Sequence, residues 1–369
     1  MAPRPTVRVP APPAPPAAPR VRDLRRTTGG PVVEWDVRTA YDYVFALSDD
    51  AGASDDLPAT DRAWLAEGKA RLRDQLGDAL ELYGKELCVM LAGLAVDRSA
   101  ITDAASFLAT LKETPNDTIV RLIVGEDLRD PERAETIERA LAGDEAAIAE
   151  TVDHVVGHHD EGARQLAFTL YRDPQKLIDA AVGVLEAWLP IYQSIEPRVH
   201  AMIARDVESR AGDRATLGAG ELIERTTGGI RWLSEPGVRR VILAPSYFAR
   251  PYNFLLGNAD WRLFGYPISD AALDAADPFA PPPAVVRLHR ALGDDTRLRI
   301  LRLLRDRDLY LTEIAQQLDL SKPTIKHHLA LLRAAGLVTV TESGSVLYYS
   351  LRTSRLDDAS IEIKQFLLG

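Results

Sequence analysis

LTEIAQQLDLSKPTIKHHLALLRAAGLV, residues 311–338, is the stretch that decides the fold of the C-terminal part of this chain. Asp319 and Leu320 interrupt it as a tight turn, and Ser321 can cap the helix that follows, where Pro323 is tolerated in the first turn. The sequence therefore predicts two short helices joined by a turn. Their buried residues recur at helical spacing: Ile314, Ala315 and Leu318, then Ile325, Leu329 and Leu332.

The residues on either side complete a recognisable unit. Residues 285–292 and 295–306 have the apolar periodicity of two further helices. After the quoted stretch, residues 338–340 and 346–351 are rich in β-branched and aromatic side chains and flank a turn that contains a glycine. A helix-turn-helix followed at once by a hairpin predicts a winged helix-turn-helix, an α+β unit.

The second helix of the pair, residues 321–334, has an outer face suited to nucleic acid. Lys322 and Lys326 are two of only seven lysines in the chain, and Thr324 and His327 share their side of the helix. A helix fits the major groove of DNA, where short polar groups reach base edges and lysines neutralise phosphates. An isolated amphipathic helix would show a polar face in any case, so the prediction of DNA binding depends on the complete order of elements.

At these residues the sequence resembles the ArsR-type winged-helix transcriptional regulators. The resemblance covers residues 284–352 and is carried by ALGDDTRLRILRLL (291–304), the 311–338 stretch and VLYYSL (346–351). It implies a homodimer in which the first and last helices, 284–292 and 355–367, pack together, and in which each subunit places a recognition helix in the groove. The residues that the resemblance implies in contact with DNA are Ser321, Lys322, Thr324, Lys326 and His327, and we add Arg333 from the same helix.

The chain departs from that family pattern where the family holds metals. Leu311–Ile314 occupy the stretch in which some members carry two cysteines, and residues 355–367 contain no histidine. The tip of the wing, residues 341–345, also lacks the arginine that many members place in the minor groove. We therefore expect no metal and no other cofactor on the strength of the resemblance.

Charge is distributed unevenly along the chain. The net charge is −10, although the ends are cationic and residues 31–280 carry the acidic excess. An acidic bulk repels DNA from most of the surface and helps to orient the protein on it. The single cysteine, Cys88, excludes an intrachain disulfide framework, and no run approaches the roughly 20 apolar residues of a membrane helix. We expect a cytoplasmic protein with no membrane partner.

Composition divides the chain into four parts. Residues 1–30, rich in proline and arginine, are expected to be a disordered tail. Residues 31–269 are expected to form a mainly helical regulatory or sensor domain that ends in strands near 230–267. Residues 270–283 are small, acidic and closed by prolines, as in a linker, and residues 284–369 form the winged helix-turn-helix domain. The predicted fold is mainly α with a small β component.

Two features of the larger part are candidates for sensing. Glu150, His154 and His158 are each four residues apart, a spacing that can hold zinc or nickel on one helix face, although a solvated acidic helix end is the more ordinary interpretation. Residues 232–266 contain eight of the 24 aromatic residues. Such a cluster can line a small-molecule pocket but is more often the core of a strand region.

The sequence thus predicts a DNA-binding transcriptional regulator, most simply a repressor, that places helix 321–334 in the major groove of double-stranded DNA as a homodimer. A small molecule bound by the N-terminal domain is the expected effector, of unspecified identity. No nucleophile, P-loop or other catalytic motif occurs, so we expect no enzyme. Two alternatives stay open: a metal-dependent hydrolase that uses the Glu150/His154/His158 face, and a winged helix that serves as a scaffold for protein contacts.

Overall fold

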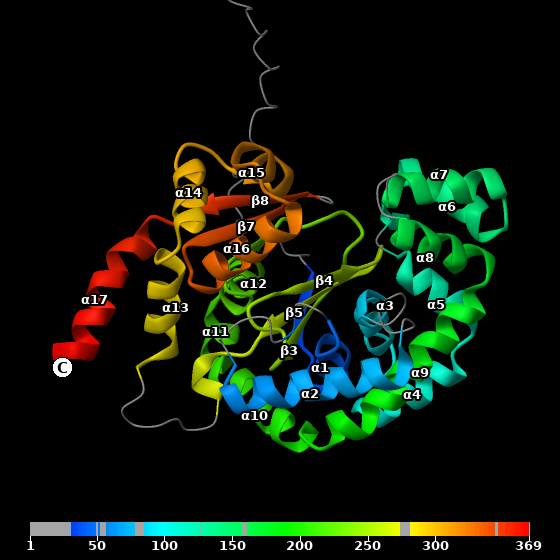
Figure 1. Cartoon of the computed structure of the whole chain (residues 1–369), viewed down its shortest axis with the longest axis horizontal. Helices are drawn as coiled ribbons and strands as arrows, with labels where there is room; N and C mark the ends of the chain where they lie inside the picture. The colour runs from blue at the N-terminus through cyan, green and yellow to red at the C-terminus, as the bar shows by residue number, and fades with distance from the viewer. Residues whose placement is uncertain are drawn as a thin grey trace, which may run out of the picture.

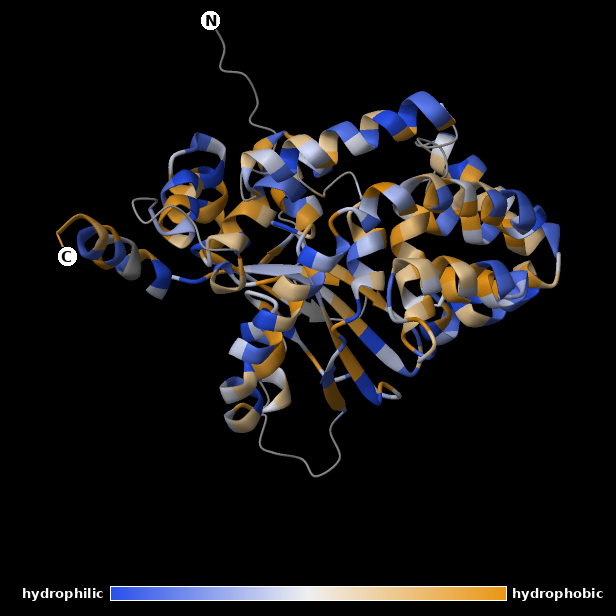
Figure 2. Ribbon diagram, turned by 90° about the horizontal axis from the view of Figure 1, so that it is seen from below, coloured by the Kyte–Doolittle hydropathy of each residue, from blue (hydrophilic) through white to orange (hydrophobic). Residues whose placement is uncertain are grey.

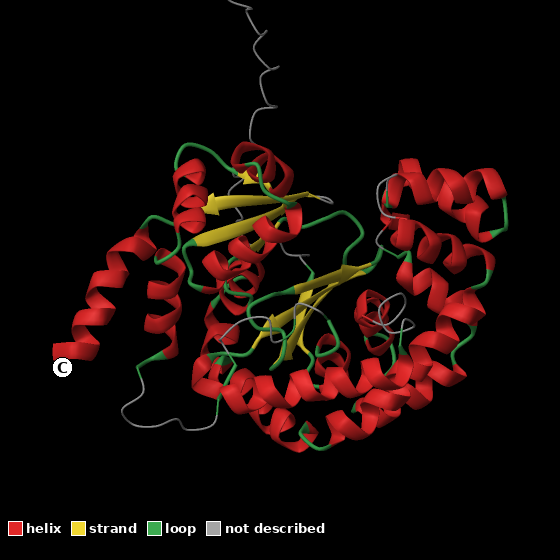
Figure 3. Cartoon of the chain, in the orientation of Figure 1, coloured by secondary structure: helices red, strands yellow, loops and turns green. Residues whose placement is uncertain are grey.

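The computed structural model describes residues 31–48, 51, 57–77, 85–125, 127–156, 161–273, 281–343 and 346–368 (Figures 1 and 3). Helices dominate, with a few strands near the middle of the molecule, and a winged helix-turn-helix closes the chain. The predicted fold class is therefore confirmed. The expected disordered tail at 1–30 and most of the expected linker, 274–280, lie outside the described residues.

The described residues between 39 and 226 are helical almost throughout. Aspartate caps recur at the helix starts: the Asp173 carboxylate accepts a hydrogen bond from the Lys176 amide at 3.3 Å, one residue before Pro174 opens the longest helix. The α-helices are α1 (Thr39–Phe45), α2 (Ala59–Leu76), α3 (Lys85–Met90), α4 (Ala104–Glu113), α5 (Asn116–Ile123), α6 (Pro131–Leu141), α7 (Glu145–Val155), α8 (Glu161–Arg172), α9 (Pro174–Gln193), α10 (Glu196–Ser209), α11 (Ala211–Thr216) and α12 (Ala219–Thr226).

A four-stranded sheet lies inside this helical part (Figure 3). Its order is β1 (Val32–Trp35), β3 (Arg240–Ser246), β5 (Trp261–Pro267) and β4 (Phe254–Gly257). The first three strands run parallel, and β4 pairs antiparallel with β5 across the turn that follows Gly257. Both β3 and β5 are buried on nearly every residue, because helices cover the sheet.

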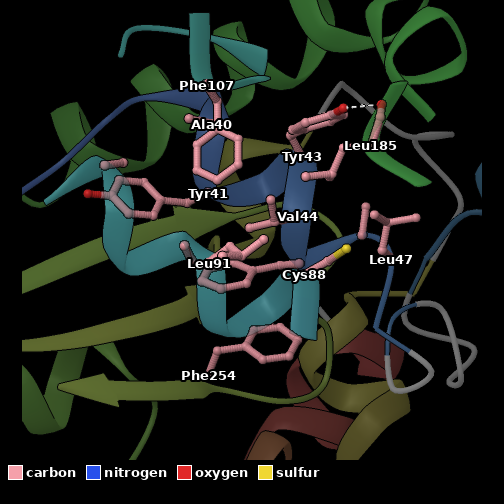
Figure 4. Close-up of a cluster of buried hydrophobic side chains, with 14 of the residues drawn as sticks. Ala40, Tyr41, Tyr43, Val44, Leu47, Cys88, Leu91, Phe107, Leu185 and Phe254 are labelled. Atoms are coloured by element: carbon pink, nitrogen blue, oxygen red, sulfur yellow. Dashed lines mark hydrogen bonds between the residues drawn. The ribbon is translucent and has the colours of Figure 1, made fainter. Parts of the chain in front are cut away.

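The core of the helical part is built around α1, every residue of which is buried. In Figure 4 the rings of Tyr41 and Tyr43 leave α1 in different directions, and the Tyr43 hydroxyl donates to the carbonyl oxygen of Leu185 on α9. Trp188 returns a bond from its indole nitrogen to the Tyr43 carbonyl at 3.0 Å. Cys88 is fully buried in the same cluster, and burial raises the pKa of its thiol to about 12, so it is a packing residue.

The winged helix-turn-helix has a hydrophobic core of its own, which runs from Leu288 to Tyr349. Its elements follow the predicted order: α13 (Pro283–Leu292), α14 (Asp295–Leu304), β6 (Leu309–Tyr310), α15 (Leu311–Leu318), α16 (Lys322–Ala334), β7 (Val338–Ser343), β8 (Val346–Leu351) and α17 (Ser354–Leu368). In Figure 1, α17 lies beside α13 at the edge of the molecule, at the opposite end from α6 and α7.

One strand does not follow the sequence prediction. Within the predicted strand region 230–267, β2 (Ile230–Trp232) does not join β3, β4 and β5 but pairs in parallel with β7 of the wing. The wing sheet therefore has the order β2-β7-β8-β6. A strand from the larger part of the chain is thus built into the sheet of the winged helix, which joins the two parts through backbone hydrogen bonds.

The described residues contain no helix that is long and apolar enough to cross a membrane. At the start of the expected linker, Asp270–Ala272 form a 3-10 turn that packs against α10. The Asp270 carboxylate is held by the guanidinium groups of Arg250 and Arg287, at 2.9 Å from the first.

Candidate nucleic-acid interface

Helix α16 begins where the sequence predicts. The Ser321 hydroxyl oxygen accepts a hydrogen bond from the Thr324 amide at 3.3 Å and lies 2.7 Å from the Thr324 hydroxyl. The preceding helix, α15, ends at Leu318, and the next residue, Asp319, has a φ of 53° that lets the chain turn back within two residues. Ile325, Leu329 and Leu332 are buried in the winged-helix core, as the spacing predicts.

The opposite face of α16 is open. Ser321, Lys322, Thr324 and Lys326 are all exposed, and the first turn of the helix therefore presents two hydroxyls and two ammonium groups to solvent. None of these four residues is needed to close the hydrophobic core. The dimensions of an α-helix match the major groove, and these side chains are of the types that contact base edges and phosphates.

His327, the next predicted contact, is half-buried rather than free. Its Nδ1 atom lies 2.9 Å from the hydroxyl of Tyr252, a residue of the loop between β3 and β4. The ammonium group of Lys326 lies 5.9 Å from the centroid of the same ring. Tyr252 of the larger part of the chain therefore reaches the edge of the recognition helix.

Arg333 does not lie on the exposed face, so the structure corrects the expectation that places it among the DNA contacts. The side chain is 7% exposed, and its two terminal nitrogens donate to the carbonyl oxygens of Thr227 at 3.0 Å and Pro251 at 2.8 Å. Burial lowers the pKa of this guanidinium to about 10. In this arrangement Arg333 binds the larger part of the chain and is not available to phosphates.

His328 faces the core side of α16, away from the exposed face. Its Nδ1 atom lies 3.7 Å from the Asp294 carboxylate, and burial lowers the pKa of its imidazole. Asp294 itself caps α14, accepting a hydrogen bond from the Arg297 amide at 2.9 Å. His328 thus packs the helices of the winged helix together.

The junction between the two parts of the chain depends on the segment Thr226–Gly229, at the end of α12. The Thr227 carbonyl accepts from Arg333 and from the Asn253 side chain, and the Gly229 carbonyl accepts from the Val340 amide at 2.8 Å. Gly229 has a φ of 119°, which only glycine adopts readily. The paired glycines are the one local signal of an unusual backbone here.

The other candidate sites are only partly visible. His154 is exposed in the last turn of α7, which ends at Val155, and His158 lies outside the described residues. Among the residues that the structure describes, no group of three histidine, cysteine or acidic side chains is placed to hold a metal ion. The eight clustered aromatic residues at 232–266 are all buried, so they form core rather than the wall of an open pocket.

Comparison with known proteins identifies the segment that carries the exposed face. A family model described as bacterial regulatory protein, arsR family, matches residues 294–340. The transcriptional repressor SdpR of Bacillus subtilis (strain 168) is 40% identical over 70 residues, which are 19% of this chain and 78% of SdpR. The chain belongs to the ArsR family. It is therefore a winged-helix regulator of transcription of the DNA-binding type.

Other relatives in the ArsR family differ in their described roles. The HTH-type transcriptional regulator CmtR of Mycobacterium tuberculosis (strain ATCC 25618 / H37Rv) is 41% identical over 86 residues, covering 23% of this chain and 73% of CmtR. The transcriptional activator HlyU of Vibrio cholerae is 36% identical over 80 residues, 22% of this chain and 72% of HlyU. A solved structure of reduced HlyU covers 23% of this chain and 90% of its own, at 29% identity and a TM-score of 0.19.

Proposed function

We propose that this ArsR-family regulator binds double-stranded DNA by placing the exposed face of α16 in the major groove. The observation that carries the proposal is the open first turn of α16, where Ser321, Lys322, Thr324 and Lys326 face solvent inside the segment that matches the family. The two lysines would contact phosphates or guanine, and the hydroxyls would contact base edges. His327 would join them once Tyr252 releases its ring.

The protein would act as a homodimer through α13 and α17. These helices pack against each other within the chain, and α17 projects from the body of the molecule (Figure 2). Ile361 and Leu367 on α17 are 54% and 67% exposed, an arrangement that is unfavourable for a helix without a partner. A dimer places two copies of α16 on one face, as two half-sites of a DNA operator require.

Repression by occupying a promoter is the simplest outcome, since a bound dimer blocks access to the DNA it covers. Residues 31–269 would serve as the regulatory domain and residues 284–369 as the DNA-binding domain, in a cytoplasmic protein that works where the DNA is. We assign no catalytic role to the larger domain. Its cysteine is buried with a raised thiol pKa, which leaves it unsuited to nucleophilic attack.

The test is a gel-shift titration of the full-length protein on the DNA upstream of its own gene. The variant Lys322→Ala/Lys326→Ala removes both exposed charges of α16, and Lys112→Ala/Lys176→Ala removes two lysines from α4 and α9 as a control of equal charge. We expect the α16 variant to bind about 100-fold more weakly, from roughly 1–3 kcal/mol for each lost contact, and the control to bind like the wild type.

Equal affinities of the two variants would refute the role of α16. Weaker binding by both variants would show that only the overall charge matters, which would also contradict the proposal. All four lysines are exposed and outside the cores, so we expect both variants to fold. Circular dichroism spectra of the wild type and the two variants check this.

A further inference from the structure

A polar cavity of about 540 Å³ lies between the two domains, beside the Thr226–Gly229 junction. Its walls come from both sides of that junction. One side comes from the larger part of the chain: the end of α10, α12 and the segments at 250–251 and 267–270. The other side comes from the winged helix: α13, the end of α16 and the residue after β8. A cavity of this size accommodates a small organic ligand.

Arginines dominate the lining of the cavity. Six of them contribute, three from each domain, against the three carboxylates of Glu221, Glu224 and Asp270. Those from the regulatory domain are Arg210, Arg225 and Arg250, and those from the DNA-binding domain are Arg287, Arg333 and Arg352.

Five of the six arginines are held by carboxylates, and two of these carboxylates lie outside the lining. Arg210 pairs with Asp206 at 2.9 Å and Arg225 with Asp213 at 3.2 Å. Asp270 is shared between Arg250, at 2.9 Å, and Arg287. Glu224 is likewise shared between Arg352, at 2.9 Å, and Arg231, at 3.2 Å. Each of these two carboxylates therefore supplies one negative charge to two guanidinium groups.

Arg333 is the one arginine of the lining that no carboxylate among the described residues holds. Its guanidinium is buried and bonds only to the two backbone carbonyls of Thr227 and Pro251, with no carboxylate partner among the described residues. A buried cation without a counter-charge is costly, since its loss of hydration is not compensated by an ion pair. An anion in the adjacent cavity would supply that compensation.

Two hydrogen-bonding groups of the cavity lining have no partner. The Nε atom of Arg250 and the hydroxyl of Ser269 are both buried without a hydrogen bond. The Arg250 side chain is 4% exposed. Buried polar groups in folded proteins are nearly always satisfied, so these two groups favour a ligand that brings hydrogen-bonding atoms to the lining.

From these observations we propose that the cavity binds a small organic anion with at least two carboxylate or phosphate groups. Guanidinium groups bind carboxylates and phosphates alike through paired hydrogen bonds, so the arginines of the lining can recognise either group. Because the arginines come from both domains, the anion stabilises the arrangement in which they are docked. That arrangement also holds His327 against Tyr252. Because His327 is a proposed DNA contact, the anion would regulate DNA binding. This regulatory step rests on the proposed function, whereas binding of the anion does not.

Isothermal titration calorimetry of the full-length protein with pyrophosphate and with citrate, at constant ionic strength and without DNA, tests the site. The variant Arg287→Gln/Arg352→Gln removes one cavity arginine from α13 and one from the segment after β8. We expect saturable binding of at least one probe by the wild type, weakened about tenfold or more in this variant. Preference for pyrophosphate or for citrate distinguishes a phosphorylated from a carboxylate ligand.

The control variant is Arg239→Gln/Arg299→Gln, which removes two arginines that are 76% and 65% exposed and do not line the cavity. It should bind the probe like the wild type. The proposal would be overturned if neither pyrophosphate nor citrate binds the wild type. It would also be overturned if both double variants lose the same amount of affinity for the probe. The single variant Arg352→Gln, whose side chain is 35% exposed, repeats the test should the double variant not fold.

A gel shift with and without the bound probe then separates the two proposals. A change in operator affinity that the Arg287→Gln/Arg352→Gln variant no longer shows supports regulation through the cavity. An operator affinity that the probe does not change would overturn the regulatory step while leaving the anion site in place. Loss of DNA binding in the Lys322→Ala/Lys326→Ala variant is measured without the probe and so reports on the proposed function alone.

Discussion

At the scale of single residues, Arg333 shows that basic side chains on one helix can serve two purposes. It lies on the same helix as Lys322 and Lys326, and its charge alone predicts a phosphate contact. Burial decides otherwise, because its guanidinium donates to two carbonyls of the larger part of the chain. The sequence could not reveal this, since the acceptors are backbone atoms more than 80 residues away, at Thr227 and Pro251.

Replacing Arg333 by alanine should therefore affect stability more than direct DNA contact. The carbonyl of Pro251 loses its donor and a void forms, so we expect the free energy of unfolding to fall by about 1–3 kcal/mol, as measured by urea denaturation. Arg299→Ala, an exposed arginine on α14, should change it by less than about 0.5 kcal/mol. Unchanged stability together with reduced operator affinity would instead make Arg333 a DNA contact.

Asp270 gives the junction between the domains a dependence on pH. Burial alone would raise the pKa of its carboxyl, but the hydrogen bond and charge of Arg287 outweigh burial and lower it. A carboxyl whose pKa is lower in the folded than in the unfolded protein stabilises the fold fully above its unfolded value, about 3.9, and loses that contribution as the pH falls further.

The wild type should therefore lose stability more steeply than Asp270→Asn as the pH is lowered from about 5 to 3, since the variant has no carboxyl to protonate at this position. Thermal unfolding of both proteins across this range provides the comparison. Parallel curves would show that the ion pairs of Asp270 with Arg250 and Arg287 contribute nothing to the folded state.

At the scale of elements, local patterns predicted most of the helices and the hairpin of the wing. Ser321 caps α16 where the sequence indicates, and residues 338–340 pair with residues 346–351 as the predicted hairpin. Partners of parallel strands were not predicted, because β1 pairs with β3 across some 200 residues and leaves no local signal. For the same reason the addition of β2 to the wing sheet was missed.

Gly229 is the residue on which this added strand depends. Its φ of 119° is unfavourable for any residue with a Cβ atom, whereas the space around that atom is ordinary, the nearest neighbour being Thr339 at 3.5 Å. Gly229→Ala should lower the free energy of unfolding by about 1–3 kcal/mol through backbone strain alone.

Gly183→Ala is the matched control, since Gly183 lies inside α9 with nothing within 4 Å of an added Cβ. Alanine there should raise the free energy of unfolding by about 0.5–1 kcal/mol, because it favours the helix. Urea denaturation of both variants measures the difference. Equal effects of the two substitutions would contradict the account of the junction.

At the scale of the whole molecule, the candidate DNA-binding face was predictable from the sequence and the connection between the domains was not. The exposed first turn of α16 follows from helical spacing, and Ser321, Lys322, Thr324 and Lys326 lie where that spacing places them. The cavity between the domains depends on residues drawn from seven separate stretches of the chain between Arg210 and Arg352. No periodicity or motif links such segments before the chain folds.

The projecting helix α17 leads to a prediction about assembly. Ile361→Glu/Leu367→Glu places two charges on its exposed apolar face, and we expect the variant to be monomeric where the wild type is a dimer. Light scattering coupled to size-exclusion chromatography gives both masses. Lys176→Glu/Gln175→Glu, on the exposed start of α9, adds charge away from α17 and should leave the dimer intact. A wild-type protein that is monomeric at micromolar concentration would rule out this interface.

The most direct test of the central claim, that α16 binds DNA through Lys322 and Lys326, is the salt dependence of operator affinity. The logarithm of the binding constant falls linearly with the logarithm of salt concentration, with a slope of about 0.9 for each phosphate that the protein neutralises. If each lysine contacts one phosphate in each subunit of a dimer, Lys322→Ala/Lys326→Ala should reduce the magnitude of that slope by about three to four. A slope that is the same for the variant and the wild type would contradict the claim.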